Sequence, residues 1–307
     1  MPRIVAVTGA TGFVGPHLIA ALAHHGWRLR LLIRRWTPLP SLAGVDADIV
    51  WGDLADETAL ARLADGVDAV VHAAGLIKAR RPGEFLAVNR DGTARLSAAA
   101  PRALFLLLSS LAAREPHLSP YATSKRAAED VVAGRAGPWC AVRAPAVYGP
   151  GDRETLAYFK MAGRGLALKP DRPEARLSLI HVEDLAEALA RTLDRPPAAS
   201  VYEIDDGRAG GYSHGDMAAA AAAGLGRPVR SVAVPQGLIG AVASLNAGRP
   251  SPQIFTPSKV RELFHPDWVA HDRRLTAALG WSARYDLTEG FRHTILWYRR
   301  HRWLQAA

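Results

Sequence analysis

The chain has 307 residues, of which 49% are hydrophobic and 22% are charged. This ordinary globular mixture argues against disorder, and the length allows one large or two modest domains. The formal net charge is +9, carried mostly by scattered arginines. We interpret these as solvated helix faces, because no recognised nucleic-acid module and no basic stripe with regular aromatics accompanies them. No apolar run approaches the ~20 residues needed to cross a bilayer.

The single cysteine, Cys140, excludes an internal disulfide. It fits a reducing cytoplasm, and the surrounding run Trp139–Val142 predicts a buried thiol. A strand is expected at once, with no charged and apolar signal segment before it, so we expect a cytoplasmic protein. The densest basic cluster, Arg292 to Arg302, predicts a terminal helix with a wet basic face. Adhesion of that helix to anionic lipid is the alternative.

Short apolar strands alternate with helices through the first half of the chain. This alternation is typical of βαβ units and a parallel sheet. The predicted strands are Ile4–Val7, Arg28–Ile33, Ala69–His72, Leu104–Leu108 and Trp139–Val142, and the predicted helices are His17–His25, Asp56–Ala64, Asn89–Ala100 and a helix from Ser119-Pro120 to Val132.

The regular alternation loosens after Gly149. The predicted elements there are a helix at Thr155–Gly163, a polar stretch over 169–173, a strand at Leu177–Ile180, a helix at Glu183–Leu193, and strands at Val201–Ile204 and Val229–Val234. We therefore expect an α/β fold, a Rossmann-type doubly wound parallel sheet with a smaller, interleaved C-terminal substrate lobe. The dinucleotide-binding domain is expected over 1–150, with 177–204 returning to it, and the lobe over 151–176 and 205–307.

A glycine-rich loop follows the first predicted strand. Its glycines are three residues apart, so that one allows a tight turn, one lets the backbone approach a diphosphate, and one lets helix and strand pack closely. The helix after the loop offers unpaired N–H groups and a positive dipole end to an anion. The loop therefore predicts a dinucleotide site, made of Gly9, Thr11, Gly12, Phe13, Val14 and Gly15.

The G-x-x-G-x-x-G spacing resembles that of short-chain dehydrogenases/reductases, and later segments resemble the extended members, the NAD-dependent epimerase/dehydratase family. Gly52-Asp53-Leu54 resembles the segment that contacts adenine, and Asn89 resembles the asparagine that opens a helix. Arg143–Asp152 resembles R-x-x-x-V-Y-G-P-G, and His181–Asp184 resembles H-V-x-D. The resemblance implies further cofactor contacts from Asp53, Leu54, Ala73, Ala74, Gly75, Ser109, Ala144 and Val147.

The end of the second predicted strand bears on the choice of nicotinamide cofactor. An NAD-binding chain would place an acidic residue about 20 positions after the glycine loop, for the ribose 2′-hydroxyl. This chain has Ile33-Arg34-Arg35 instead. Since arginine pairs with phosphate through a planar, charge-assisted fork, we predict NADP, bound in part by Arg34, with NAD as the alternative. The competing interpretation is that both arginines are simply solvated.

The segment from Tyr121 to Lys125 carries the Y-x-x-x-K motif of this family. Residues four apart on a helix share one face. A free tyrosine has a pKa of about 10, too high for proton transfer at neutral pH, and a neighbouring ammonium and the cationic nicotinamide ring lower it. We therefore predict that Tyr121 is the general acid/base and that Lys125 is its activator and a ribose ligand.

Two serines end the strand before this motif. The resemblance implies that Ser110 holds the reacting oxygen, with Ser109 as the reserve candidate. The predicted function is an NAD(P)-dependent oxidoreductase that transfers hydride at a carbonyl or secondary alcohol. A nucleotide-sugar epimerase/dehydratase is the alternative, although the segment Leu111–Ser119 lacks the V-Y-G of many such enzymes. A non-catalytic NADP-binding structural or assembly protein is a third possibility, which the intact Tyr121 and Lys125 disfavour.

The substrate, a small molecule, is left open by the sequence. A nucleotide sugar would use a basic cradle, and a hydrophobic substrate would use the apolar stretches Leu238–Leu245 and Ile254–Phe255. We predict no metal site, because the histidines lack partners at ligand spacing, and we expect His72 and His181 to shape backbone. The resemblance implies a homodimer through a four-helix bundle of Asn89–Ala100 and Ala122–Val132. The basic residues of the cradle would be Arg153, Lys160, Arg164, Lys169, Arg172 and Arg176.

Overall fold

The computed structural model describes residues 3–35, 37–38, 42, 44–246 and 256–305. The chain divides into two compact units, each with its own core. The first comprises Met1–Ala144, Leu185–Glu203 and Asp272–Trp281, and the second comprises Pro145–Asp184, Ile204–His271 and Ser282–Ala307. Residues 145–150 and 177–184 thus lie in the second unit, although we expected them in the dinucleotide-binding domain. The reason is that strand β10 (Leu179–His181) pairs with β7 (Ala146–Tyr148) and does not join the large sheet.

The first unit is built on a seven-stranded sheet in the order β11-β6-β5-β4-β1-β2-β3, with every pair parallel. This confirms the predicted Rossmann-type α/β fold. The strand missed from the sequence is β3, which lies at the sheet edge and is only half-buried, so its residues lack the continuous apolar run of the central strands. The strands are β1 (Ile4–Thr8), β2 (Arg28–Ile33), β3 (Ala47–Trp51), β4 (Ala69–His72), β5 (Leu104–Ser110), β6 (Trp139–Ala144) and β11 (Val201–Glu203).

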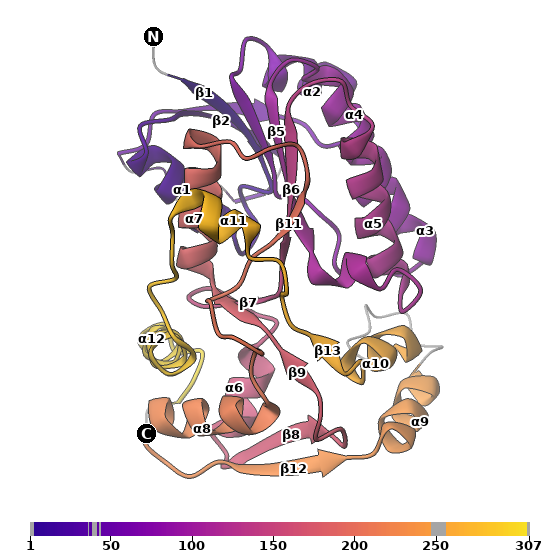
Figure 1. Ribbon diagram of the computed structural model, residues 1–307, viewed down its shortest axis with the longest axis vertical. Coiled ribbons are helices and arrows are strands. Elements are labelled where there is room, and N and C mark those ends of the chain that lie inside the picture. The colour runs from indigo at the N-terminus through magenta and orange to yellow at the C-terminus, as the bar shows by residue number, and fades with distance from the viewer. Residues whose placement is uncertain (1–2, 36, 39–41, 43, 247–255, 306–307) are drawn as a thin grey trace. The chain divides into compact units, whose positions relative to one another are not determined.

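Helices cover both faces of this sheet (Figure 1), with α2, α4 and α5 on one side and α1, α7 and α11 on the other. The core under the first group is apolar and fully buried, and includes Leu60, Leu96, Phe105 and Val132. The helices of this unit are α1 (Gly15–His24), α2 (Glu57–Ala64), α3 (Pro82–Phe85), α4 (Gly92–Ala99), α5 (Pro120–Ala133) and α11 (Arg274–Leu279), together with α7 (Val182–Asp194) from Leu185 onward and the 3-10 turn η2 (Leu111–Arg114).

One predicted helix boundary is wrong. Asn89 does not open a helix, because α3 already begins at Pro82 and the chain stays helical to Ala99. The middle of this helix is the π-helical segment η1 (Leu86–Asp91), which contains Asn89. Single-turn π segments are frequent at functional sites, and they carry no periodicity that a sequence pattern would reveal.

The second unit has an aromatic core. Tyr148, Phe159, Phe291 and Tyr298 are fully buried and pack edge to face, with ring centroids 4.8–5.6 Å apart where Phe159 meets Phe291 and Tyr298. This unit is built from short pairs of parallel strands and from helices (Figure 1). The strands are β7, β8 (Leu166–Pro170), β9 (Arg176–Leu177), β10, β12 (Arg230–Val234) and β13 (Asp267–Trp268), and the helices are α6 (Leu156–Ala162), α8 (His214–Leu225), α9 (Gln236–Asn246), α10 (Pro257–Leu263) and α12 (Leu287–Arg300).

Three smaller expectations concern burial and membranes. Cys140 is buried, and burial raises the pKa of its thiol to about 12, so it is an inert core thiol. The predicted C-terminal helix is α12, which buries Phe291 and exposes Arg292 and Arg300. Among the described residues, no helix combines the length and the apolar character that a membrane crossing requires.

Candidate active site

The glycine-rich loop joins β1 to α1 in the first unit, and close backbone contacts require two of its glycines. Gly9 has a φ of +81°, and a Cβ at this position would lie 2.7 Å from the backbone of Ala73. A Cβ on Gly15 would overlap the carbonyl oxygen of Ala10. Gly12, in the middle of the loop, is exposed. The loop therefore packs tightly against the segment after β4 at Gly9, while Gly12 in the centre of the loop is exposed to solvent.

The end of α1 that faces this loop suits an anion. The backbone N–H groups of Phe13 and Val14 have no hydrogen-bond partner among the described residues. The first turn of α1 contains no acidic residue, and no side chain caps it. Unpaired N–H groups at a helix N-terminus, without a competing carboxylate, form a phosphate site. These residues therefore fit the diphosphate of a dinucleotide.

His72 ends β4 next to this loop and is linked to two threonines. Its Nδ1 lies 2.7 Å from the Thr8 hydroxyl, and its Nε2 lies 2.9 Å from the Thr93 hydroxyl. Thr93 donates its proton to the Asn89 carbonyl, so it accepts from Nε2–H. The Nδ1 atom then accepts from Thr8, whose oxygen accepts the Ala74 N–H at 3.3 Å. His72 thus shapes the backbone of the Ala73–Gly75 loop, in agreement with the prediction.

The protonation state of His72 follows from its surroundings. Burial, aided by the charge of Lys125, lowers the pKa of His72 to about 3. The imidazole is therefore neutral at physiological pH, and a single tautomer satisfies all of its hydrogen bonds. The partners of His72 are 64 and 21 residues away in the chain. We call the hydrogen-bonded chain of Thr8, His72 and Thr93 the relay. No sequence motif predicts it, because the register of β1 with β4 and the packing of α4 together bring the three side chains into contact.

Asn89, inside the π segment, holds the next part of the same loop. Its Oδ1 accepts the Leu76 N–H at 2.7 Å, and its Nδ2 donates to the Leu76 carbonyl at 3.0 Å. The Nδ2 also donates to the Ser124 hydroxyl at 2.8 Å, which in turn donates to the Tyr121 carbonyl. Asn89 therefore couples the loop after β4 to the helix that carries Tyr121.

Tyr121 and Lys125 lie one turn apart on α5, as their spacing predicts. Ser119 caps this helix through the Ala122 N–H, as expected. The Lys125 side chain is buried, and its Nζ donates to the Leu108 carbonyl at 2.7 Å. Burial lowers the pKa of Lys125 to about 8, against the opposing charge of Glu129. The Tyr121 ring is half-buried and meets Phe85 edge to face at 6.1 Å.

The two serines at the end of β5 make different contacts. Ser109 is buried, and its hydroxyl donates to Glu129 Oε1 at 2.5 Å. Arg143 donates two hydrogen bonds to the same carboxylate, at 2.9 and 2.7 Å. Ser110 is half-buried, and among the described residues its hydroxyl accepts the Ala112 N–H at 3.2 Å. The hydroxyl of Ser109 is therefore engaged in a buried ion-pair network, which the sequence did not reveal.

The residues expected to contact the adenosine part of a cofactor are exposed or half-buried. Arg34 and Arg35 follow β2, and both side chains are exposed. Asp53 follows β3, and its carboxylate accepts the Ala55 N–H at 2.8 Å. Leu54 packs on the helix backbone at Gly92, where a Cβ would lie 2.9 Å from the leucine side chain. Arg34, Asp53 and Leu54 remain predictions for cofactor binding.

The last two predicted cofactor residues belong to different units. Ala144 ends β6 in the first unit, and Val147 lies in β7 of the second. The first unit therefore contains every predicted cofactor and catalytic residue except Val147.

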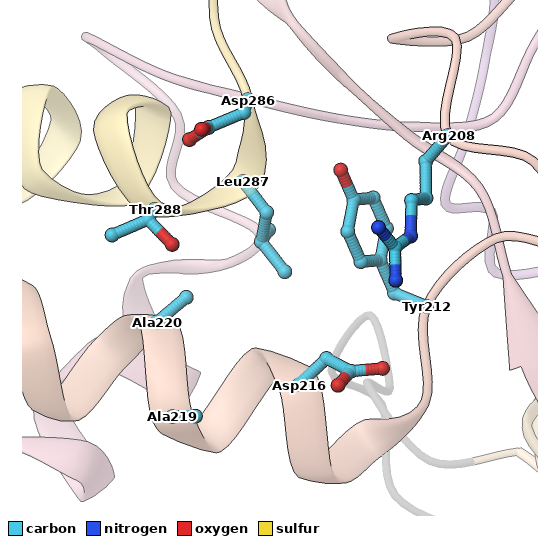
Figure 2. A pocket seen from close by; sticks show the side chains of 8 residues that line it. All are labelled: Arg208, Tyr212, Asp216, Ala219, Ala220, Asp286, Leu287 and Thr288. Carbon is cyan, nitrogen blue, oxygen red and sulfur yellow. The ribbon is translucent and has the colours of Figure 1, made fainter.

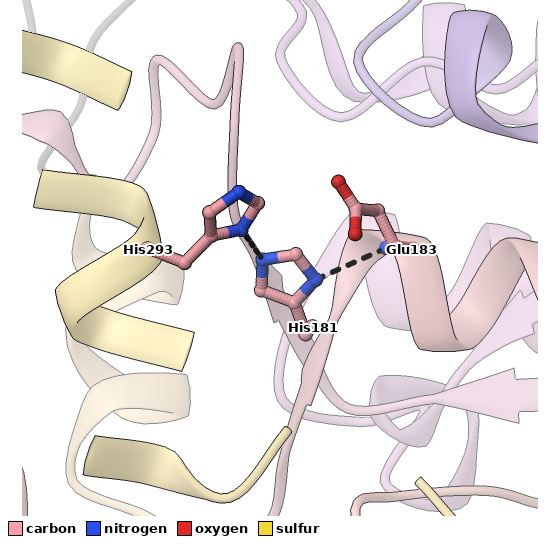
Figure 3. Close-up of side chains that lie close together, drawn as sticks. All are labelled: His181, Glu183 and His293. Carbon is pink, nitrogen blue, oxygen red and sulfur yellow. Dashed lines mark hydrogen bonds between the residues drawn. The ribbon is translucent and has the colours of Figure 1, made fainter. Parts of the chain in front are cut away.

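The second unit contains a cluster of His181, Glu183 and His293 (Figure 3), whose candidate ligand atoms lie within 4.8 Å of one another. His181 Nδ1 accepts the Glu183 N–H at 3.3 Å, so the ring proton is on Nε2. The Nε2 then donates to His293 Nδ1 at 3.2 Å. Tyr285 stacks on His293 at 5.3 Å and donates to Glu183 at 2.9 Å. This arrangement favours hydrogen bonding over metal ligation for His181.

A pocket of about 340 Å³ lies between α8 and the start of α12 in the same unit (Figure 2). The carboxylates that line the pocket already accept hydrogen bonds from neighbouring residues. Asp216 accepts from the Ser213 N–H and hydroxyl, and Asp286 accepts the Glu289 N–H. None of the predicted site residues lines it. The pocket is lined by Arg208, Tyr212, Asp216, Ala219, Ala220, Asp286, Leu287 and Thr288.

Some of the basic residues proposed as a cradle for a nucleotide sugar interact with other groups of the chain. The guanidinium of Arg153 lies over the Trp303 ring at 5.1 Å, and Arg172 pairs with Glu174 at 3.5 Å. Arg176 donates to the Pro173 carbonyl. Of the apolar stretches, Leu238–Leu245 lies in α9, whereas Ile254–Phe255 lies outside the described residues.

Comparison with known proteins gives concordant results. The model of the NAD dependent epimerase/dehydratase family matches residues 5–204. Ceramide reductase of Caulobacter vibrioides is 43% identical, over 98% of this chain and 96% of that protein. The crystal structure of gox2253 has a TM-score of 0.81 at 23% identity, covering 99% of this chain and all of that one. MoeE5 in complex with UDP-glucuronic acid and NAD has a TM-score of 0.72 at 25% identity, covering 97% and 99%.

Proposed function

The chain belongs to the NAD-dependent epimerase/dehydratase family, and from that premise we propose that it is an NADP-dependent reductase of a ketone carried by a ceramide-type lipid. Membership makes it a nicotinamide-dependent enzyme of the oxidoreductase/epimerase class. The observation that carries the lipid substrate is the 43% identity to ceramide reductase over nearly the full length of both chains. A ketone is the group of such a lipid that hydride and a proton convert into a hydroxyl.

The cofactor would be held mainly by the first unit. The tight loop around Gly9 and Gly15 and the unpaired N–H groups of Phe13 and Val14 support a diphosphate site there. The remaining cofactor contacts would come from Thr11, Gly12, Asp53, Leu54, Ala73, Ala74, Gly75, Ser109, Tyr121, Lys125, Ala144 and Val147. When bound, the cofactor supplies the hydride for the carbonyl carbon.

The choice of NADP rests on Arg34. Its guanidinium is exposed directly after β2 and is available to a phosphate. Replacement Arg34→Asp should reverse the preference from NADPH toward NADH, measured by fluorescence titration of both. A protein that already binds NADH more tightly than NADPH would contradict this part of the proposal.

Residues of the chain would donate the proton to the substrate and stabilise the negative charge that this leaves. Tyr121 would donate its phenolic proton to the ketone oxygen as hydride reaches the carbon, which yields the secondary alcohol. Lys125 would stabilise the phenolate that remains, and its position is set by the Leu108 carbonyl. Ser110 would hold the ketone oxygen, because the Ser109 hydroxyl is already bound to Glu129.

An epimerase acting on a nucleotide sugar is the second candidate. It is favoured by the likeness to MoeE5, which was solved with UDP-glucuronic acid and NAD, at 25% identity. The lower identity, and the partners that Arg153, Arg172 and Arg176 already have, make it the weaker proposal.

A homodimer is the partner that we propose. Helices α4 and α5 pack side by side in the first unit, and both are rich in alanine, which allows close approach of a second pair. Light scattering at micromolar concentration should give the mass of two chains, and a monomer would contradict the proposal.

One assay separates the two enzymatic candidates. The purified protein is incubated with NADPH and a water-soluble, short-chain ceramide analogue that has a ketone in place of its secondary hydroxyl. We expect loss of NADPH absorbance and a product with two additional hydrogens by mass spectrometry. Interconversion of UDP-glucose and UDP-galactose, with the ketone left intact, would reverse the assignment.

A further inference from the structure

The second unit exposes apolar side chains on one face of the β8–β12 pair. Leu168 pairs with Val232 in this parallel register, and Leu166 pairs with Arg230. Paired residues of neighbouring strands project to the same face. Leu166, Leu168 and Val232 are 43%, 49% and 37% exposed. We call this surface, with Arg230, the β8–β12 face.

The opposite side of the same strands is covered. Helices α6 and α8 contact β8 and β12 and lie on one side of them (Figure 1), and Ala167 between the two leucines is buried. Alternation along β8 therefore turns Leu166 and Leu168 outward as a consequence of burying Ala167. The apolar character continues into α9, where Leu238 is 60% exposed. Neighbouring apolar side chains left in water mark an interaction surface more often than scattered single ones do.

The N-terminal end of this strand pair is basic. The stretches 156–170 and 226–241 contain five basic residues and no acidic one. Because the strands are parallel and Arg230 pairs with Leu166, the exposed Arg164 and Arg230 lie at the same end of the pair, whereas the exposed Asp171 follows the other end of β8. Elsewhere in the chain, acidic and basic residues are mixed, as in the pairs of Arg126 with Asp130 and of Arg191 with Glu187. The five basic residues are Lys160, Arg164, Lys169, Arg227 and Arg230.

We propose that the β8–β12 face docks on the surface of a membrane rich in anionic lipids. This inference rests on the proposed function, since an enzyme with a ceramide-type substrate has to collect it from a bilayer. Exposed leucines that enter the interface, beside arginines that attract anionic headgroups, are the combination that peripheral membrane proteins use. No helix of the described residues crosses the membrane, so this attachment would be reversible.

A second copy of the chain fits this face less well. A stable dimer interface buries roughly 800 Å² on each partner, which three half-exposed side chains do not approach. Symmetric pairing would also bring the exposed Arg164 and Arg230 toward the same residues of the second copy. An anionic lipid surface meets the same residues with opposite charge.

Vesicle sedimentation tests the proposal with the full chain. The probes are sucrose-loaded vesicles of phosphatidylcholine alone and of equal parts phosphatidylcholine and phosphatidylglycerol. We expect binding to the anionic vesicles, weakening as salt is raised, and little binding to phosphatidylcholine alone. The pair Leu168→Ser and Val232→Ser should lower partitioning by about tenfold. The pair Arg164→Gln and Arg230→Gln should lower it by roughly tenfold as well.

The matched control is Leu296→Ser. Leu296 is 47% exposed on α12, next to the exposed Arg292 of the C-terminal basic cluster. Its replacement should leave partitioning unchanged, and circular dichroism melting should show that all variants fold. Binding that is lost with Leu296→Ser and kept in the Leu168/Val232 pair would overturn the proposal. So would equal binding to both vesicles, or a dimer that becomes monomeric in the Leu168/Val232 pair.

Failure of the proposal can be told from failure of the proposed function. Reduction of the water-soluble ketone needs no vesicle, so it measures the reaction alone. Intact reduction without vesicle binding overturns only the docking surface. Vesicle binding that depends on Leu168 and Val232, without any reduction, supports the surface and rejects the reductase.

Discussion

The two units differ in how completely they pair their buried polar groups. In the first, His72, Thr8, Thr93 and Asn89 are buried and linked by hydrogen bonds that end on loop backbone. In the second, the buried Tyr148 hydroxyl has no hydrogen-bond partner among the described residues and sits among aromatic rings. A buried polar group is costly unless it is paired. Both units therefore hold loops through buried polar contacts, as Asp184 does for the Arg284 and Tyr285 N–H groups, but the second unit also tolerates an unpaired hydroxyl within its aromatic core.

The pKa shifts of buried cationic and acidic groups differ in direction but share one cause. Burial lowers the pKa of His72 and Lys125, because it disfavours their cationic forms. Burial raises the pKa of Tyr148 and Tyr298, because it disfavours phenolate. Burial thus favours the neutral form of each group, although Lys125, with a pKa of about 8, is still mostly cationic at pH 7. Only in the first unit do the shifts approach the range in which proton transfer is useful.

The largest effect should come from Tyr121→Phe. Loss of the general acid should lower turnover by about 10³-fold while NADPH binding stays largely intact. Steady-state kinetics with the ketone analogue and fluorescence titration measure the two quantities. The control is Tyr158→Phe, because the buried Tyr158 hydroxyl has no partner among the described residues. Full activity in Tyr121→Phe would refute its role.

Breaking the relay of the first unit should cost stability. In His72→Leu the hydroxyls of Thr8 and Thr93 lose the imidazole as a hydrogen-bond partner. The free energy of unfolding at pH 7 should therefore fall by about 2–4 kcal/mol. Urea denaturation measures it. An unchanged free energy of unfolding would mean that the relay has no structural role.

The pH dependence of stability provides a second readout for His72. The folded pKa of about 3 is below the ordinary value of 6.5, so below pH 6.5 the unfolded state binds more protons. The contribution of His72 is therefore fully present above pH 6.5 and is lost progressively as pH falls toward 3. The wild type should lose stability more steeply than His72→Leu between pH 6.5 and 5, by up to roughly 1.4 kcal/mol per pH unit.

The aromatic core of the second unit allows a reciprocal test. A Cβ on Gly290 would overlap the Tyr148 hydroxyl, so Gly290→Ala should destabilise by roughly 2–3 kcal/mol. Tyr148→Phe should be nearly neutral alone, because it removes an unpaired hydroxyl, and it should rescue part of the loss in the double variant, since ring carbons of residue 148 would still lie 2.9 Å from the new Cβ. Additive effects in this double-mutant cycle would show that the two groups do not meet.

The smallest effect concerns Lys125, and it should be stabilising. The folded pKa of about 8, compared with the ordinary value of 10.5, means that the buried charge destabilises the folded state by roughly 3 kcal/mol. Lys125→Met removes this penalty but also removes the hydrogen bond to the Leu108 carbonyl, which contributes about 1 kcal/mol. Because the folded pKa is depressed, the penalty acts below pH 8 and disappears by pH 10.5. Melting curves should show Lys125→Met more stable at pH 7 by about 1–2 kcal/mol, but inactive. Equal stability at pH 7 would contradict the burial of its charge.

Much of the first unit could be predicted because its signals are local. The ends of β2 and β4, the start of α5 at Pro120 and the parallel sheet all follow from short apolar runs, turn residues and a helix cap. The edge strand β3 and the π segment around Asn89 were missed, because half-burial and a shifted hydrogen-bond pattern leave no periodic trace. The unit boundary near Ala144 was missed because pairing of β7 with β10 depends on residues more than 30 positions apart.

The sequence by itself determined the spacing of Gly9, Gly12 and Gly15 and of Tyr121 and Lys125, since turn geometry and helix periodicity act over a few residues. The tertiary structure alone decided that Ser109 binds Glu129, that His72 joins Thr8 to Thr93, and that the β8–β12 face stays uncovered. Those outcomes depend on strand register and on which helix covers which face. Such partners are distant in the chain, and their choice is made by burial of the whole core rather than by any local pattern.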